Sequence, residues 1–256
     1  MLLPLGDMVK KRNFEVRRVS RTPSTQDVVL RAAAAGAADG YCCVAREQTQ
    51  GRGRLGRSWV ASPGSGLLAS VLLRVLPRAL EGLPFAAGLA VVDALATAYG
   101  VDASLKWPND VLVDGRKLAG ILVELAPGSA SRRDVAAVVG LGLNLHVARF
   151  PAGINGVSLH ELTGDIPDAD RVLQAWLEAL SARAGSAEED GIAALLPDWR
   201  AHATGLGEHV QVVRPSGTVT GTAIDVAADG ALLVRTADGV ERVVAGDVNL
   251  SASPAT

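Results

Sequence analysis

The chain has 256 residues with a formal net charge of −2, and 48% of its residues are hydrophobic against 20% charged. This length allows one large domain, alone or with a second small one. The composition excludes a disordered chain and a globally basic nucleic-acid-binding protein. Only 4 of the 25 cationic residues are lysines. Because arginine is used almost everywhere else, a lysine in the interior of the sequence needs a specific reason.

No segment of the chain predicts a membrane span or a secretory signal. The most apolar stretch, residues 82–101, contains Pro84 and Asp93, which favours a buried helix over a spanning one. At the N-terminus the apolar residues precede the charged ones, the reverse of a secretory signal. Cys42 and Cys43 are adjacent in an apolar run, which is typical of buried thiols in a reducing compartment. We therefore expect a cytoplasmic protein.

The first half of the chain alternates predicted helices and strands. We expect residues 1–14 to form a flexible N-terminal segment. Ser24 and Thr25 then precede a run of good helix formers, as helix-capping residues do. Residues 46–66 have no apolar period and predict a long loop, of the kind that is either functional or disordered. The predicted elements around this loop are a helix at 26–35, strands at 41–45 and 67–75, and a helix at 84–99.

The second half contains a predicted hairpin, a further strand, two helices and then a series of short strands with alternating apolar residues. Asp114-Gly115 predicts a type I′ turn in the hairpin. The predicted elements are strands at 111–113, 118–125 and 135–147, helices at 170–184 and 188–202, and short alternating strands at 210–213, 219–226, 232–236 and 240–244. The last four predict a small SH3-like barrel. We therefore expect a large domain over residues 15–205 and a barrel over residues 206–256.

Residues 47–59, with the sequence EQTQGRGRLGRSW, are the most informative loop of the chain. Their glycines match the G-x-G-x-x-G pattern, but Pro63 and Gly64 follow where a dinucleotide-binding fold would begin a helix. No Gly-Lys-Ser/Thr closes the pattern, which excludes a P-loop. Four arginines, at positions 46, 52, 54 and 57, accompany the single Glu47. Such a loop suits a carboxylate or a phosphate, and the alternative is a solvated basic loop.

A second group of motifs contains both interior lysines. Lys106-Trp-Pro-Asn-Asp110 precedes the predicted hairpin, and Lys117-Leu-Ala-Gly-Ile follows its turn. A lysine is a compact charge that can contact one phosphoryl oxygen, although Lys106 could equally be a strand-edge cation beside a tryptophan. The segment Gly140-Leu-Gly-Leu-Asn144 ends a predicted strand. Its two glycines have no side chains, which allows a flat ring to lie against the backbone.

Taken together, these motifs resemble those of the biotin–protein ligases, the biotin–[acyl-CoA carboxylase] ligases, in order from Ser24 to Asn144. The resemblance implies an α+β fold: a mixed β-sheet with flanking helices, class II synthetase-like, as in the biotin–lipoate ligase catalytic domain, followed by the SH3-like barrel. It implies biotin and ATP as substrates with Mg²⁺, and biotinyl-5′-adenylate as the intermediate. The biotinyl group would pass to one lysine of a biotin carboxyl carrier domain.

The resemblance also assigns roles to residues. Ser24, Thr25 and Gln26 would line the ureido end of biotin with Gln48, although Gln26 departs from the family's Ser-Thr-Asn. The catalytic candidates are Arg54, Lys117 and Asp110. The substrate-binding candidates are Ser24, Thr25, Gln26, Gln48, Gly51, Arg52, Gly53, Arg57, Trp59, Gly120, Leu122 and Asn144.

Within that set, the phosphate end has its own assignments. Arg52, Gly53 and Arg54 would hold the biotin carboxylate and the α-phosphate, and Lys117 would touch the α-phosphate. Trp59 would pack under the closed loop, Gly120 and Leu122 would border biotin, and Asn144 would contact adenine. Asp110 would position Mg²⁺ or steer the carrier amine.

Two alternatives stay open at this point. One is a lipoate-type adenylate-forming ligase of related fold, and the other is a non-catalytic regulator that binds biotin or a nucleotide. About 15 residues precede the expected catalytic domain, too few for a helix-turn-helix, so we expect no DNA binding. We expect no membrane association, and a monomer or a weak homodimer.

Overall fold

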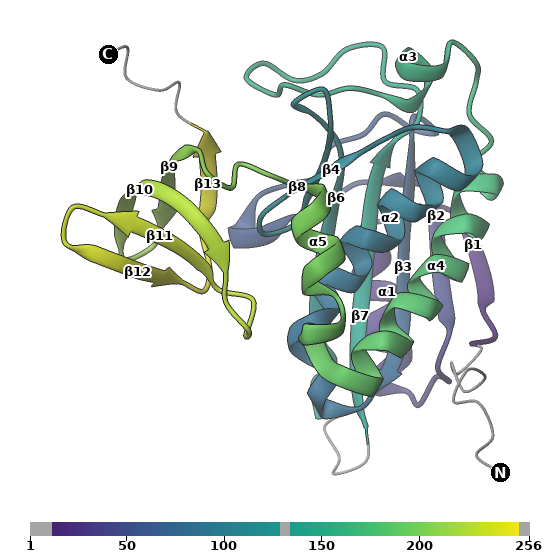
Figure 1. Ribbon diagram of the computed structural model, residues 1–256. Coiled ribbons are helices and arrows are strands. Elements are labelled where there is room, and N and C mark those ends of the chain that lie inside the picture. Colours follow the sequence, from purple (N-terminus) through teal and green to yellow (C-terminus); the bar gives the residue numbers. More distant parts are fainter. Residues whose placement is uncertain (1–11, 129–133, 251–256) are drawn as a thin grey trace, which may run out of the picture.

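The computed structural model describes residues 12–128 and 134–250, which form a large mixed β-sheet flanked by helices and a smaller antiparallel sheet (Figure 1). The strands of the large sheet lie in the order β1–β2–β3–β7–β6–β5–β4–β8. Their bounds are β1 Glu15–Thr22, β2 Tyr41–Gln48, β3 Gly66–Val75, β4 Ser104–Lys106, β5 Asp110–Val113, β6 Arg116–Leu125, β7 Val135–Asn144 and β8 Ala203–Thr204. The pairs β1–β2 and β4–β8 are parallel and the others antiparallel, so the expected mixed sheet is confirmed.

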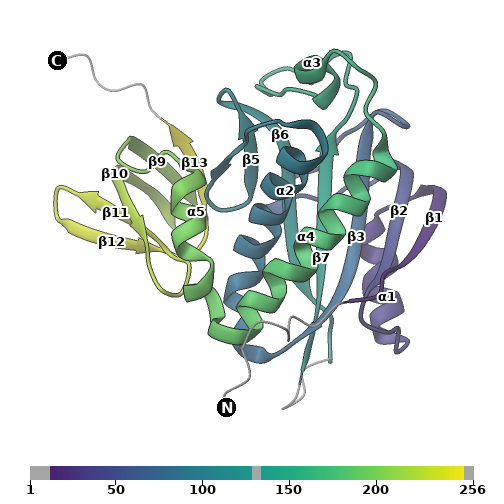
Figure 2. The ribbon, with the colours of Figure 1, turned by 45° about the vertical axis from the view of Figure 1, so that its right-hand side comes forward.

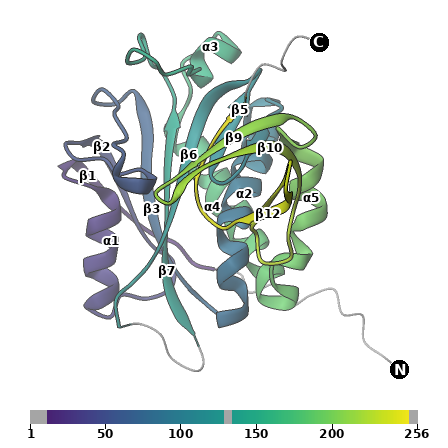
Figure 3. The same cartoon turned by 90° about the vertical axis from the view of Figure 1, so that its left-hand side faces the viewer.

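Helices cover both faces of this sheet, as Figure 3 shows. Helix α1 (Thr25–Ala34) packs on one face, and α2 (Leu83–Tyr99) and α4 (Ala169–Asp190) pack on the other. The sequence of β7 explains this arrangement, because its side chains alternate between the faces. Val139 and Leu141 belong to the core under α2 and α4, whereas Val138 lies under α1.

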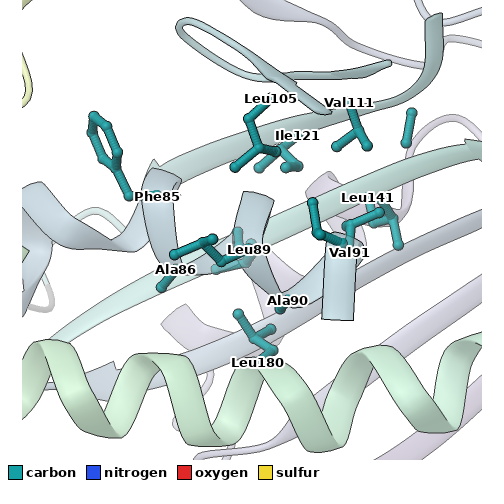
Figure 4. Close-up of a cluster of buried hydrophobic side chains, with 14 of the residues drawn as sticks. Phe85, Ala86, Leu89, Ala90, Val91, Leu105, Val111, Ile121, Leu141 and Leu180 are labelled. Atoms are coloured by element: carbon teal, nitrogen blue, oxygen red, sulfur yellow. The ribbon is translucent and has the colours of Figure 1, made fainter. Parts of the chain in front are cut away.

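Helix α2 is the centre of the larger core. Figure 4 shows its Phe85, Leu89 and Val91 packed among side chains of the sheet and of α4. The segment Pro77–Tyr99 is long and apolar enough to span a membrane, but 72% of its most apolar window is buried inside the fold. The segment is therefore a helix of the protein core, as the sequence predicted from Pro84 and Asp93.

The C-terminal sheet is antiparallel, with the order β12–β11–β10–β9–β13. Its strands are β9 His209–Arg214, β10 Gly217–Val226, β11 Leu232–Thr236, β12 Gly239–Val243 and β13 Asp247–Leu250, the last of which the sequence did not predict. The sheet lies beside α5 (Leu196–His202), as Figure 2 shows. It is joined to the large domain by a hydrogen bond of 3.0 Å from Trp107 Nε1 to the carbonyl oxygen of Gly230. The expected domain boundary at 205–206 falls between β8 and β9.

The hairpin β5–β6 has the expected turn, since Asp114 and Gly115 both have positive φ, 50° and 70°. The helix expected at 188–202 is not continuous, although α5 ends at His202 as expected. Helix α4 runs on to Asp190, Gly191 breaks it with a φ of 64°, and α5 begins only at Leu196. The remaining short elements are the 3₁₀ helices at Arg54–Gly56, Pro77–Gly82 and Gly191–Ala194, and α3 at Leu159–Thr163.

The expected flexible segment at 1–14 lies mostly outside the described residues, but its last three residues are described and belong to the packed domain. Arg12 is buried and donates a hydrogen bond of 2.8 Å to Glu188 Oε2. Its guanidinium also lies 3.4 Å from a carboxylate oxygen of Asp39. The packed domain therefore includes Arg12, and the boundary at residue 15 is corrected.

Candidate active site

A pocket of about 320 Å³ opens on the α1 face of the large sheet, beyond the N-terminal end of that helix. The strand register explains its flat floor. Ser70, Gly140 and Leu122 pair in one row across three strands, and the next row pairs Gly142 with Gly120. Apart from Leu122, these positions carry a serine or a glycine, so little side-chain volume stands on the floor. All the candidate site residues except Gly51 line this pocket.

The base of the pocket is a buried polar network at the start of α1. Gln48 Oε1 accepts a hydrogen bond of 2.7 Å from the backbone N–H of Thr25, which fixes the side chain of Gln48. Thr25 Oγ1 lies 2.8 Å from Ser70 Oγ, and Ser70 donates to Gln26 Oε1 at 2.9 Å. Ser24 also lines the pocket, and its side chain does not cap the helix. The base therefore offers neutral hydrogen-bonding groups in fixed positions.

The side chain of Trp59 lies on the glycine floor. A Cβ at Gly142 would stand 2.5 Å from the indole, and one at Gly120 would stand 3.0 Å from it. The sequence predicted that a flat ring could lie against the backbone of these glycines. In this structure that ring is the indole of Trp59. Gly140 has a different purpose, because a Cβ there would lie 2.6 Å from Gln26 Oε1. Each glycine is thus required by a close neighbour.

Both interior lysines converge on one carboxylate at the opposite end of the pocket. Lys117 Nζ lies 2.5 Å from Asp110 Oδ1, and Lys106 Nζ lies 3.9 Å from Asp110 Oδ2. Lys117 Nζ also lies 5.6 Å from the centroid of the Trp59 ring, over its face. Burial lowers the pKa of Lys106, and the charge of Asp110 partly opposes this shift. Lys106 is therefore part of an ion-paired cluster rather than a solvated edge residue.

The arginine loop is folded back on itself above the floor. Gly53 N donates to Arg57 O at 2.7 Å, and Trp59 N donates to Gly51 O at 2.9 Å. A Cβ at Gly51 would lie 2.3 Å from Trp59 O, so Gly51 shapes the loop without lining the pocket. Leu55 turns the loop tip with a φ of 52° and is half exposed.

The arginines of this loop are anchored to three different parts of the chain. Arg52 pairs with Asp27 of α1 and with Glu124 of β6 at 2.9 and 2.8 Å. Arg57 forms an ion pair with Asp247 of β13, so the C-terminal sheet reaches the edge of the pocket. Burial lowers the pKa of Arg54, and the charge of Asp247 partly opposes it. The loop is exposed at Arg52 and Arg57, as a solvated basic loop would be, but both arginines are also ion-paired to other elements.

Several pocket residues were not predicted from the sequence. They include Ser70, Asn109, Phe150 and Ile154. The available signal for Ser70 was a lone hydroxyl within the apolar run at residues 67–73. Asn144 lines the pocket as expected, and its amide nitrogen donates to the carbonyl oxygens of Lys117 and Val157, both at 3.1 Å.

This fold and this pocket define a member of a known ligase family. Residues 19–144 match the model of the biotin/lipoate A/B protein ligase family, and residues 205–251 match that of the biotin protein ligase C-terminal domain. The chain belongs to the biotin protein ligase family.

Similar proteins agree with this assignment. A biotin–[acetyl-CoA-carboxylase] ligase of Mycobacterium tuberculosis is 37% identical over 90% of this chain and 86% of its own length. One from Paracoccus denitrificans is 36% identical over 90% of this chain and 98% of its own length. A solved structure of the biotin protein ligase of Aquifex aeolicus, in complex with biotin and ATP, has a TM-score of 0.79 at 30% identity. It covers 93% of this chain and 99% of that chain.

Proposed function

We propose that this chain activates biotin with ATP to give biotinyl-5′-adenylate and pyrophosphate. It then transfers the biotinyl group to one lysine of the biotin carboxyl carrier domain of an acyl-CoA carboxylase. Biotin–[acetyl-CoA-carboxylase] ligase activity is what the similar curated proteins have. The observation that carries the proposal is a single pocket that joins a neutral polar base to a cationic end across a glycine floor. This layout suits a molecule with a polar head, an apolar body and a carboxylate tail.

In the first step, a carboxylate oxygen of biotin attacks the α-phosphorus of ATP, and the bond from that phosphorus to the pyrophosphate oxygen breaks. Bringing the two anions to about 4 Å costs roughly 4 kcal/mol at an effective dielectric near 20. Lys117 and Arg54 line the pocket and supply the positive charge that offsets this repulsion. Asp110 holds Lys117 in place before the substrates enter.

In the second step, the neutral amine of the carrier lysine attacks the carbonyl carbon of the adenylate, AMP leaves with the electrons of the broken anhydride bond, and the amine releases one proton to solvent. No protein nucleophile is needed. The anhydride hydrolyses in open water, so it has to be covered. The loop at 51–59 already lies over the glycine floor through Trp59, and it must shift to admit substrates and then close over them.

Magnesium would enter with ATP, bound through phosphate oxygens. Among the described residues, no three histidine, cysteine, aspartate or glutamate side chains gather as metal ligands. The carboxylate of Asp110 is already paired with Lys106 and Lys117. These contacts favour a role for Asp110 in holding Lys117 over a role in binding Mg²⁺, and steering of the carrier amine stays a prediction.

We also infer a cytoplasmic location. Cys42 and Cys43 are both free and buried. Burial raises the pKa of Cys42 to about 12, so its thiol stays protonated and unreactive at neutral pH. Free thiols of this kind are usual in a reducing compartment. The predicted oligomeric state, a monomer or a weak homodimer, can be tested by analytical ultracentrifugation with and without biotin and ATP.

The deciding experiment is ATP–pyrophosphate exchange measured with biotin, with lipoate and with neither. We expect exchange that depends on biotin, followed by transfer of labelled biotin to a purified carrier domain. Exchange supported by lipoate alone would favour the lipoate-type alternative. Biotin binding without any exchange or transfer would favour the non-catalytic regulator.

A further inference from the structure

The two interior lysines stand on different sides of one carboxylate. Lys117 and Asp110 line the pocket, whereas Lys106 does not. Lys117 Nζ lies 2.5 Å from Asp110 Oδ1, and Lys106 Nζ lies 3.9 Å from the other oxygen, Oδ2. Lys106 is therefore placed to influence a substrate in the pocket only through Asp110.

The backbone around Lys106 is fixed on both sides. Lys106 pairs with Asp110 of β5 and with Thr204 of β8, and the next residue, Trp107, donates a hydrogen bond of 3.0 Å to Gly230 O. Lys117 has a choice of partners, since its Nζ lies over the ring of Trp59 as well as beside Asp110. Lys106 is thus the lysine that stays, and Lys117 is the one that can change partners.

The proposed chemistry requires such a change of partners. For Lys117 to contact the α-phosphate, its ion pair with Asp110 has to be exchanged for one with the phosphate. The side chain of Asp110 is only 17% exposed, and a carboxylate left unpaired there, beside a triphosphate, is strongly unfavourable. Lys106 remains on Oδ2 and keeps Asp110 paired.

The charges of the cluster also favour the exchange. Two lysines and one carboxylate carry a net charge of +1, and without Lys106 the cluster would be neutral. Burial lowers the pKa of Lys106, Asp110 opposes this shift, and the charge of Lys117 lowers the pKa further. The two ammonium groups therefore repel each other, and this repulsion is relieved when Lys117 moves to a phosphate.

We propose that Lys106 is a positioning residue for adenylate formation: it keeps the Asp110 carboxylate compensated while Lys117 exchanges that carboxylate for the α-phosphate. This inference rests on the proposed function, because the phosphate is that of ATP. It gives the two interior lysines separate roles. Lys117 contacts the substrate, and Lys106 acts through Asp110.

The test is a double-mutant cycle on biotin-dependent ATP–pyrophosphate exchange, with kcat and KM reported separately. Lys106→Met should lower kcat about tenfold and leave KM for biotin unchanged, because the polar base of the pocket is intact. In an Asp110→Asn protein the same Lys106→Met substitution should cost no more than about twofold, since the group through which Lys106 acts is gone. The dissociation constant of AMP, measured by calorimetry with biotin present, completes the same cycle without turnover and should show the same pattern.

Further variants keep the test decisive. Lys106→Gln replaces Lys106→Met if that protein does not fold, and Lys106→Arg, which keeps the charge, should retain kcat within about threefold. Arg18→Met is the matched control, since it removes a cation from an ion pair with Asp170 outside this pocket, and its kcat should equal that of the wild type.

Three results would overturn the inference: an unchanged kcat in the neutral variants, an equal loss with and without Asp110, or a loss in Lys106→Arg as large as in Lys106→Met. Absence of biotin-dependent exchange in the wild type would instead overturn the proposed function.

Discussion

The two ends of the pocket are built in opposite ways. The base is formed by Thr25, Gln26 and Ser70, which are buried and bonded to one another and to strands of the sheet. The cover is the arginine loop, whose Leu55 and Arg57 are exposed and whose links to the rest of the chain are ion pairs. The difference indicates a division of labour: the base recognises a neutral group by fixed geometry, whereas the cover supplies charge and has to move.

The largest expected effect is at the cationic end. Lys117→Ala should lower adenylate formation by about 100- to 1000-fold, because it removes charge from the reacting phosphoryl group. Biotin binding, measured by calorimetry without ATP, should stay largely intact because the base is unchanged. Arg116→Ala is the control, since Arg116 pairs with Glu161 and does not line the pocket. A Lys117→Ala protein with wild-type exchange would refute the assigned role.

The floor between the two ends should be the next most sensitive feature. Gly142→Val places a branched side chain against the indole of Trp59, which would stand only 2.5 Å from a Cβ at this position. We expect kcat/KM to fall about 30-fold, since small misplacement of reacting groups has large effects on rate. Gly128→Ala, in a turn away from the pocket, serves as the control substitution. Normal activity in Gly142→Val would show that no flat group needs this floor.

The mobility of the cover can be measured by limited trypsin digestion. The exposed loop should be cut near Arg54 or Arg57 in the free protein, and biotin with ATP should slow this cleavage about tenfold as the loop closes. Cleavage elsewhere in the chain serves as the internal reference. If substrates leave the rate of loop cleavage unchanged, the closure argument is wrong.

The smallest expected effect concerns the link to the C-terminal sheet. Asp247→Ala removes the partner of Arg57, and KM for ATP should rise about threefold, because ion pairs between exposed groups contribute little individually. Asp238→Ala, on the far hairpin of the same sheet, should have no effect. The swapped pair Arg57→Asp with Asp247→Arg should recover part of the loss. A change in kcat alone would argue against a role in loop placement.

Features that depend on neighbouring residues could be predicted from the amino-acid sequence. The Asp114-Gly115 turn, the core helix α2 and the motifs around Arg54 and Lys117 are all local patterns, and the structure has each of them. Strand β1 was not predicted, because Val16 and Val19 are its only apolar residues. Its extended conformation depends on parallel pairing with β2.

Contacts between residues far apart in the chain could be identified only in the folded protein. Ser70 joins Thr25 across 45 positions, and Arg57 meets Asp247 across 190. The indole of Trp59 covers the glycine floor of β6 and β7, and Asp110 brings both interior lysines together. The physical reason is that strand register and the packing of α1 set these contacts, and neither leaves a periodic or local signal in the sequence.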